Sequence, residues 1–203
     1  MVTGLHLSFS LFIVIAIFYG MHFFLIRKYD PFREKGSSGD PRYTIVGLAV
    51  CIFLILQPTF LPILGLYTDA SWGMNFQIIG LLLFFSSLLL HWWARSNLQQ
   101  FFGERIEVQQ DQHLIETGPY AYIRHPIYTS FFIFGFGLLL LNPALPILLI
   151  LVYVFWDYGR LVSEEEELLG NNIPGYHAYI NRTSRFFPMP GKRPKERNNP
   201  EWN

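Results

Sequence analysis

The segment GPYAYIRHPIY, residues 118–128, places ring side chains and a basic pair immediately before a long apolar run. The Gly-Pro dipeptide at its start indicates a turn. Pro126 suits the first turn of a helix, because its missing N–H would have no intrahelical partner there. Free N–H groups at a helix start attract anions, and Arg124 and His125 add positive character beside them. The segment therefore predicts a site for a negatively charged group at the start of an apolar helix.

A second cluster, RLVSEEEELL at residues 160–169, follows the next apolar run. Four consecutive glutamates near a helix C-terminus oppose the helix dipole, which favours cations at that end. Arg160 and Glu164 form an i,i+4 pair in the less favourable order. A charge run of this kind is often a solvated helix end, but its cost here indicates positive partners. If the two apolar helices fold back on each other, Glu164 and Glu165 come close to the basic pair at 124–125.

The composition indicates which elements position these groups. The chain has 203 residues, of which 51% are hydrophobic, 18% aromatic and 15% charged. Soluble domains usually carry about 25% charged residues, so the deficit indicates a membrane protein. The single cysteine, Cys51, excludes an internal disulfide framework and a cysteine metal site.

Apolar runs long enough to cross a bilayer need about 20 residues. The run from 127 to 158 is too long for one span, and the Asn-Pro pair at 142–143 divides it into two helices. The first of these is short and would require a locally thinned bilayer. The sequence thus predicts an all-α polytopic membrane protein with about five transmembrane helices, the last two forming a tight hairpin. The expected spans are 5–26, 44–67, 76–94, 126–141 and 144–167.

The basic residues predict the orientation. Five of the 15 Lys and Arg residues fall in 27–42, three in 95–124 and seven from 160 onward. With five spans these segments share one side, which the positive-inside rule assigns to the cytosol. We therefore expect the N-terminus outside and the motif-bearing face in the cytosol. The polar tail at 191–203 is expected to be mobile and close to acidic lipid head groups.

Other polar residues give weaker signals. His91 lies near the inner end of the third expected span beside two tryptophans, and interfacial anchoring is its favoured interpretation. His22 has no partner that the sequence reveals. His113 precedes the turn, where it either lines a site or belongs to a plain loop. No two histidines have metal-ligand spacing with a carboxylate, so no metal site is expected.

These motifs together resemble one family. HLIETGPYAYIRHPIY at 113–128, the Asn-Pro turn, RLVSEEEEL, YHAY and RFFP are similar to the integral-membrane methyltransferases. That family includes isoprenylcysteine carboxyl methyltransferase and the phospholipid methyltransferases. The resemblance covers about residues 80–190. It implies one integral-membrane domain over 1–203, with two N-terminal spans in 1–75, a methyltransferase core in 76–190 and the tail.

The resemblance implies S-adenosylmethionine as the methyl donor and a lipid or prenylated acceptor that enters from the bilayer. Arg160 and Glu164 are the expected catalytic residues, with Arg160 steering an anionic acceptor. The chain departs from many members at Asn172-Ile173, where they have Phe-Gly. The expected cofactor-binding residues are His113, Gly118, Tyr120, Arg124, His125, Pro126, Tyr128, Glu164, Glu165, Tyr176 and Tyr179.

Several alternatives stay open. A prenylated-thiol carboxylate and an amino head group are both compatible with the motifs, and carboxyl O-methylation is preferred. A sterol-type membrane reductase would need a nicotinamide site, for which five spans in 203 residues leave little room. A small transporter or scaffold would carry ionisable residues deep in its spans, yet apart from histidines the span centres lack them. The sequence indicates no nucleic-acid partner and does not reveal the oligomeric state.

Overall fold

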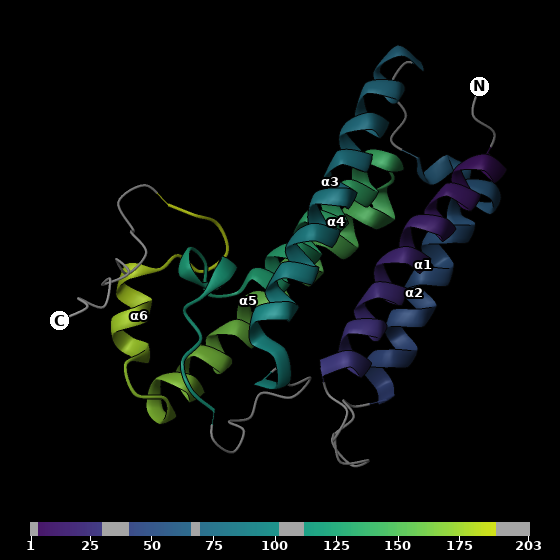
Figure 1. Ribbon diagram of the computed structural model, residues 1–203. Coiled ribbons are helices and arrows are strands. Elements are labelled where there is room, and N and C mark those ends of the chain that lie inside the picture. The colour runs from purple at the N-terminus through teal and green to yellow at the C-terminus, as the bar shows by residue number, and fades with distance from the viewer. Residues whose placement is uncertain (1–3, 30–40, 66–69, 102–111, 190–203) are drawn as a thin grey trace.

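The computed structural model describes residues 4–29, 41–65, 70–101 and 112–189, and helices joined by loops make up these ranges (Figure 1). The predicted all-helical membrane architecture is confirmed. The described helices are α1 Gly4–Tyr29, α2 Pro41–Phe60, η1 Pro62–Leu64, α3 Ala70–Leu98, η2 Gln99–Phe101, η3 Gly118–Ala121, α4 Pro126–Leu141, α5 Leu145–Asn172 and α6 Tyr176–Arg182.

Three described helices are long and apolar enough to cross a membrane, namely Leu5–Tyr29, Gly73–Leu98 and Leu145–Asn172. Two shorter apolar helices, Gly47–Phe60 and Pro126–Leu141, accompany them. The fourth expected span, 126–141, coincides with α4, while α5 continues five residues beyond the expected end at 167. The count of five spans and the division of the chain into spans, core and tail stay predictions.

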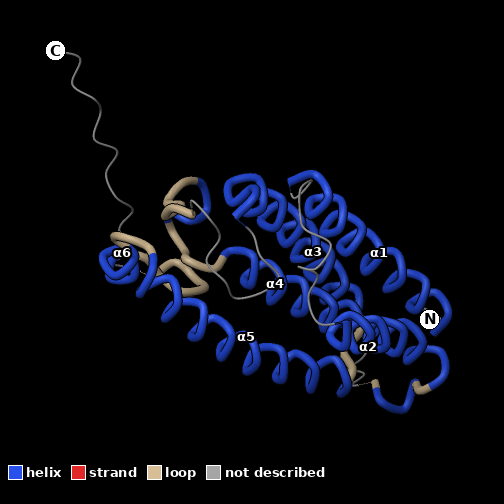
Figure 2. The backbone as a smooth tube through the Cα atoms, turned by 90° about the horizontal axis from the view of Figure 1, so that it is seen from below, coloured by secondary structure: helices blue, strands red, loops and turns tan. Residues whose placement is uncertain are grey.

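The helices pack side by side around α3 and α4 (Figure 1). The α1–α2 pair lies against one side of them, whereas α5 leads away toward α6 (Figure 2). Loops, η3 and α6 gather at one end of the bundle in both views. The main apolar core joins α1, α3, α4 and the start of α5 through buried residues such as Phe18, Phe84, Phe134 and Ile147. Large apolar side chains on the outer faces are exposed, as lipid contact requires.

The closest helix contact joins α3 to α4 through two glycines. A Cβ atom added to Gly80 would lie 2.9 Å from the carbonyl oxygen of Gly137, and one added to Gly137 would lie 3.0 Å from that of Gly80. Small residues at such crossings let helix backbones approach closely within a bilayer. Larger side chains at these two positions would push the helices apart.

The turn between α4 and α5 is held by polar side chains at the other end of the bundle from α6. Asn142 ends α4, and its Nδ2 donates to Oε1 of Gln57 on α2 at 2.8 Å. Gln57 Nε2 in turn donates to the carbonyl of Leu61 at 2.9 Å. Both side chains are buried, at 2% exposure. The Asn-Pro pair thus ends the helix and also ties the turn to α2.

Candidate functional site

The turn at the start of the predicted motif forms η3 and docks on the end of α3. Gly118 has φ +59°, a conformation that favours glycine. A Cβ atom there would lie 2.5 Å from the side chain of Asn97 on α3. Thr117 Oγ1 also donates to Asn97 Oδ1, at 3.2 Å. Glycine is therefore required at 118 both for the backbone conformation and for the close approach to α3.

Tyr120 projects from η3 into the protein interior. Its carbonyl accepts a 2.6 Å hydrogen bond from the Tyr179 hydroxyl, which ties η3 to α6. Its own hydroxyl is buried and has no hydrogen-bond partner among the described residues. Burial raises the pKa of Tyr120 well above its usual range, and the Glu165 charge adds to the effect. The phenol therefore stays protonated and available as a hydrogen-bond donor.

Residues 180–186, here called the C-terminal strap, run beside the start of α4. The N–H of Arg124 donates to the carbonyl of Ser184 at 2.8 Å, and the N–H of His125 donates to that of Arg185 at 3.1 Å. Thr129 Oγ1 donates to the carbonyl of Phe186 at 2.8 Å. The sequence suggested that backbone N–H groups at the start of α4 bind an anion. The N–H groups of Arg124 and His125, which lie just before that helix, are instead bonded to the strap.

The guanidinium group of Arg124 also forms hydrogen bonds with other groups of the protein. Its Nη1 donates to the carbonyl of Ile180 at 3.0 Å and to that of Thr183, both in the strap. Its Nε donates to Oε1 of Glu166 at 2.8 Å. The side chain is buried, so this arginine links the strap, the start of α4 and the end of α5.

Glu166 is the carboxylate at the centre of this network. Its Oε1 also lies 3.1 Å from His125 Nε2, and its Oε2 pairs with Arg185 of the strap. The Glu166 side chain is only 8% exposed. A buried carboxylate is tolerated when hydrogen-bonded cations surround it, and three basic side chains do so here.

The expectation for Glu164 is wrong in one respect. It does not join the basic pair: its side chain is 52% exposed, and its carboxylate accepts a 3.2 Å hydrogen bond from Arg160 on the same helix. Glu166, rather than Glu164, pairs with Arg124 and His125. The turn of α5 explains the difference, because Val162 and Glu166, four residues apart, lie on its buried face.

Glu165 occupies the inner side of the same helix end. Its Oε2 lies 3.6 Å from His125 Nδ1, and the Tyr128 hydroxyl lies near the carboxylate. The Oε2 atom is buried and makes no hydrogen bond within the described part of the chain. Buried polar atoms are almost always paired, so an acceptor at Glu165 and a donor at Tyr120 are the features of a site that receives a polar ligand.

Tyr176 and Tyr179 close this region from α6. Their rings lie 5.8 Å apart and are buried with Ile173. Burial raises the pKa of both phenols, so each stays neutral. Gly175, at φ +83°, allows the sharp entry into α6 after α5 ends at Asn172. The segment in which this chain departs from many family members therefore shapes the connection to these tyrosines.

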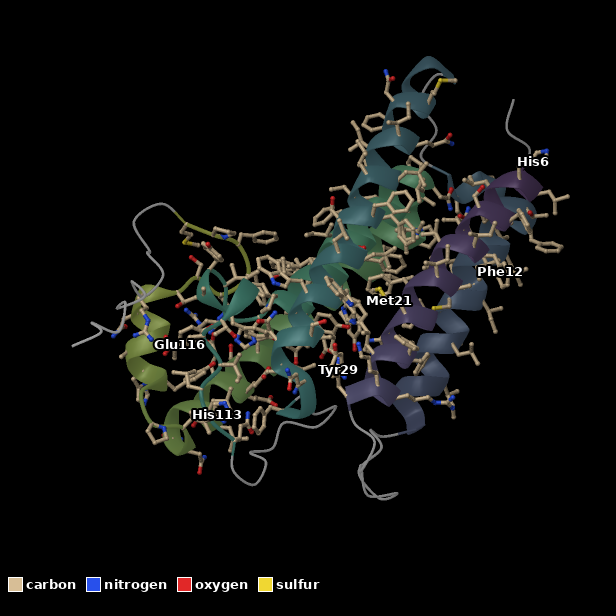
Figure 3. All side chains as sticks on the ribbon, viewed as in Figure 1. His6, Phe12, Met21, Tyr29, His113 and Glu116 are labelled. Carbon is tan, nitrogen blue, oxygen red and sulfur yellow. The ribbon has the colours of Figure 1, made fainter. Side chains whose placement is uncertain are left out.

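The remaining expected residues lie at varying distances from this centre. His113 is exposed, its ring packing edge-on against Phe101 at 4.9 Å beside α5 and α6 (Figure 3). Arg160 is 50% exposed and pairs with Asp157 and Glu164, each at 3.2 Å. Pro126 is buried at the first turn of α4, as expected. The binding and catalytic roles of all these residues stay predictions.

Sequence reasoning missed two groups that the structure places in the network. Glu166 follows Val162 by four residues and precedes Leu169 and Ile173 by three and seven, which is the spacing of one helix face. That pattern was a usable signal for the buried glutamate. The strap carbonyls and Arg185 had no such signal, because backbone acceptors leave no mark on side-chain identity. Within the described ranges, no three His, Cys, Asp or Glu side chains are grouped as a metal site.

Comparisons with known proteins agree with these features. The family model of isoprenylcysteine carboxyl methyltransferase matches residues 78–170. Protein-S-isoprenylcysteine O-methyltransferase of Saccharomyces cerevisiae is 26% identical over 193 residues, which span 90% of this chain and 80% of that protein. The nickel-cobalt-cadmium resistance protein NccN of Alcaligenes xylosoxydans xylosoxydans is 33% identical over 84 residues, 41% of this chain and 39% of that protein.

A solved structure shares the fold. The structure of the eukaryotic intramembrane Ras methyltransferase ICMT aligns with a TM-score of 0.69 at 23% identity, covering 92% of this chain and 68% of that one. The matched region contains η3, α4 and the glutamate run, which are the elements that build the site. Residues 78–170 therefore match the isoprenylcysteine carboxyl methyltransferase family, and most of the chain is similar to a relative of that name.

Proposed function

We propose that this membrane protein methylates the carboxylate of an isoprenylcysteine-like acceptor, using S-adenosylmethionine as the donor. One observation carries the assignment of the donor site. The Tyr120 hydroxyl and Glu165 Oε2 are buried without hydrogen-bond partners in the described part of the chain, at the end of the bundle where the family motifs meet. The acceptor class follows from the family and from the relatives named for it.

The residues present fit such a donor. Glu165 would accept hydrogen bonds from its ammonium group or ribose hydroxyls, and Tyr120 would donate to one of its acceptors. The rings of Tyr128 and Tyr176 would pack against its adenine or its cationic centre. When bound, the donor supplies an electrophilic methyl group on a sulfonium sulfur. Gly118, Pro126 and Tyr179 would act by holding the surrounding backbone and Tyr120 in place.

Arg124 and His125 would serve this site indirectly. Both side chains are bonded to Glu166, and Arg124 also to the strap, so their role is to hold the end of α5 beside the start of α4. That placement sets the position of Glu165, which immediately precedes Glu166 on α5. His113 lies further out and would at most cover the entrance.

Methyl transfer to a carboxylate requires alignment rather than proton transfer. The acceptor is already anionic and needs no general base, and a site of low dielectric favours a step in which opposite charges neutralise. Arg160, held by Asp157 and Glu164, would steer the acceptor carboxylate toward the site. If an Arg160→Lys variant kept unchanged turnover and acceptor affinity, Arg160 would not have this steering role.

The membrane context supports an acceptor that arrives through the bilayer. The described helices expose apolar side chains on their outer faces, which is costly unless lipid covers them. The distribution of Lys and Arg supports a cytosolic site and an external N-terminus. The membrane would be the cytoplasmic one in a prokaryote and the endoplasmic reticulum in a eukaryote.

Calorimetric titration of the purified protein with S-adenosylhomocysteine tests the donor. We expect saturable binding by the parent protein and its loss in Glu165→Ala, with Glu167→Ala as the matched control on the exposed side of the helix. Absence of binding by the parent protein would overturn the proposal. Activity on a prenylated cysteine with a free carboxylate tests the acceptor, whereas activity on amino head groups that rises steeply with pH would indicate an amine acceptor instead.

A further inference from the structure

A string of polar side chains crosses three helices inside the apolar bundle. His22 Nδ1 on α1 lies 3.0 Å from His91 Nε2 on α3, and His91 Nδ1 lies 2.8 Å from Ser130 Oγ on α4. His91 and Ser130 are both at 0% exposure. The interpretation of His91 as an interfacial anchor is therefore wrong. Polar groups within spanning helices are costly, so a buried string of them calls for a role.

The proton positions along the string follow from its last member. Ser130 Oγ lies 2.6 Å from the carbonyl of Ile127 and donates its one proton there. It must then accept from His91, whose Nδ1 carries the hydrogen. In a neutral ring Nε2 is then an acceptor, so His22 Nδ1–H donates to it. Each hydrogen bond fixes the direction of the next.

The string ends at the peptide group that holds Tyr128. The Ile127 carbonyl, which accepts from Ser130, belongs to the same planar peptide unit as the N–H of Tyr128. The Tyr128 ring lies 5.8 Å from that of His125, whose Nδ1 lies 3.6 Å from Glu165 Oε2, and the Tyr128 hydroxyl lies near the same carboxylate. Three hydrogen bonds and one peptide unit thus connect α1 to Tyr128, which lies beside the carboxylate assigned to the donor.

We propose that His91 is a positioning residue for the Tyr128–Glu165 pair, acting through Ser130 and the Ile127 peptide. This inference rests on the proposed function, because its effect is measured as donor affinity. His91 contacts neither the donor nor the reacting atoms in this proposal. It holds the first turn of α4 at the rotation that brings the Tyr128 hydroxyl to Glu165.

His91→Phe tests the proposal, because a phenyl ring suits the neighbouring rings of Phe18 and Phe131 but forms neither hydrogen bond. We expect S-adenosylhomocysteine to bind about fivefold more weakly or worse, the equivalent of one lost hydrogen bond. His91→Asn keeps a donor near the Nδ1 position and should restore most of the affinity. His91→Gln reaches toward His22 instead and should behave like the phenylalanine variant.

A second variant separates positioning from general packing. In a Tyr128→Phe background, which lacks the hydroxyl at the end of the path, His91→Phe should cause no further loss of affinity. Ser130→Ala should weaken binding like His91→Phe, whereas Ser87→Ala should not, although Ser87 is equally buried and makes the same bond to a carbonyl three residues back.

The outcomes are distinguishable. Parent protein that fails to bind S-adenosylhomocysteine would overturn the proposed function itself. Parent protein that binds, with His91→Phe equally tight or with additive losses in the double variant, would overturn only the positioning role. If His91→Phe does not fold, two other comparisons test the positioning role. These are His91→Asn against His91→Gln, and Ser130→Ala against Ser87→Ala.

Discussion

The two ends of α4 are both held by buried polar side chains, but they differ in how completely these are paired. At the Asn142 end, the amide pair with Gln57 has no buried polar atom without a hydrogen bond in the described structure. At the His125 end, a larger network around Glu166 leaves the Tyr120 hydroxyl and Glu165 Oε2 without hydrogen bonds to the described residues. A fully hydrogen-bonded network stabilises the turn. A buried polar atom without a hydrogen bond lowers the stability of the folded protein, and a ligand that bonds to it can offset this loss.

The largest effect is expected at the centre of the network. Glu166→Ala leaves Arg124, His125 and Arg185 without their shared carboxylate, and breaking a buried ion pair costs about 3–5 kcal/mol. The free energy of unfolding, measured in mild detergent, should fall by this order, and the strap should become sensitive to protease. Glu167→Ala, on the exposed side of α5, is the control. An unchanged unfolding transition would show that Glu166 does not hold the strap.

Glu165 should behave in the opposite way. Glu165→Gln removes the charge of a carboxylate whose Oε2 makes no hydrogen bond to any described residue and has only a 3.6 Å contact with His125, so stability should stay unchanged or rise slightly. Donor affinity should fall about 100-fold if the carboxylate binds a cationic or hydroxyl group directly. Titration with S-adenosylhomocysteine beside a thermal unfolding curve measures both. A variant that loses stability but keeps affinity would reverse the contrast between the two neighbouring glutamates.

Asn142 tests the other end of the helix. Asn142→Ala leaves the buried Gln57 amide without its partner and should cost about 1–3 kcal/mol of stability. Because this end lies away from the proposed site, affinity for S-adenosylhomocysteine should not change in protein that remains folded. A loss of affinity would mean that the two ends of α4 are coupled.

The smallest effect is expected at Tyr120. Tyr120→Phe removes an unpaired hydroxyl, so folding should be unaffected and donor affinity should fall about threefold to tenfold. Since burial raises the pKa of Tyr120 well above its usual range, the phenol keeps its proton as the pH rises through about 10, the ordinary tyrosine pKa. Binding should therefore lose nothing to this group at alkaline pH. Tyr122→Phe, at the exposed ring of the same segment, is the control.

Local signals in the sequence were sufficient for the elements and for part of the site. Pro126 and the Asn-Pro pair at 142–143 delimit α4 at both ends, because proline acts on its immediate neighbours. Tyr120 and Glu165 were among the expected residues for the same reason, since both belong to compact motifs. The choice among Glu164, Glu165 and Glu166 depends on how α5 is rotated against α4. The buried position of His91 depends on where α1 packs.

The glycine contact between Gly80 and Gly137 limits how the protein can move during a catalytic cycle. Backbones in direct contact slide or separate only by breaking many atomic contacts at once, so we expect α3 and α4 to move together. Asn97, His91 and the turn at Gly118 all belong to or dock on that helix pair. Under the proposed function, exchange of spent donor for fresh donor would therefore proceed by displacement of the strap and α6, whose links to α3, α4 and the turn at Gly118 are hydrogen bonds that can reform.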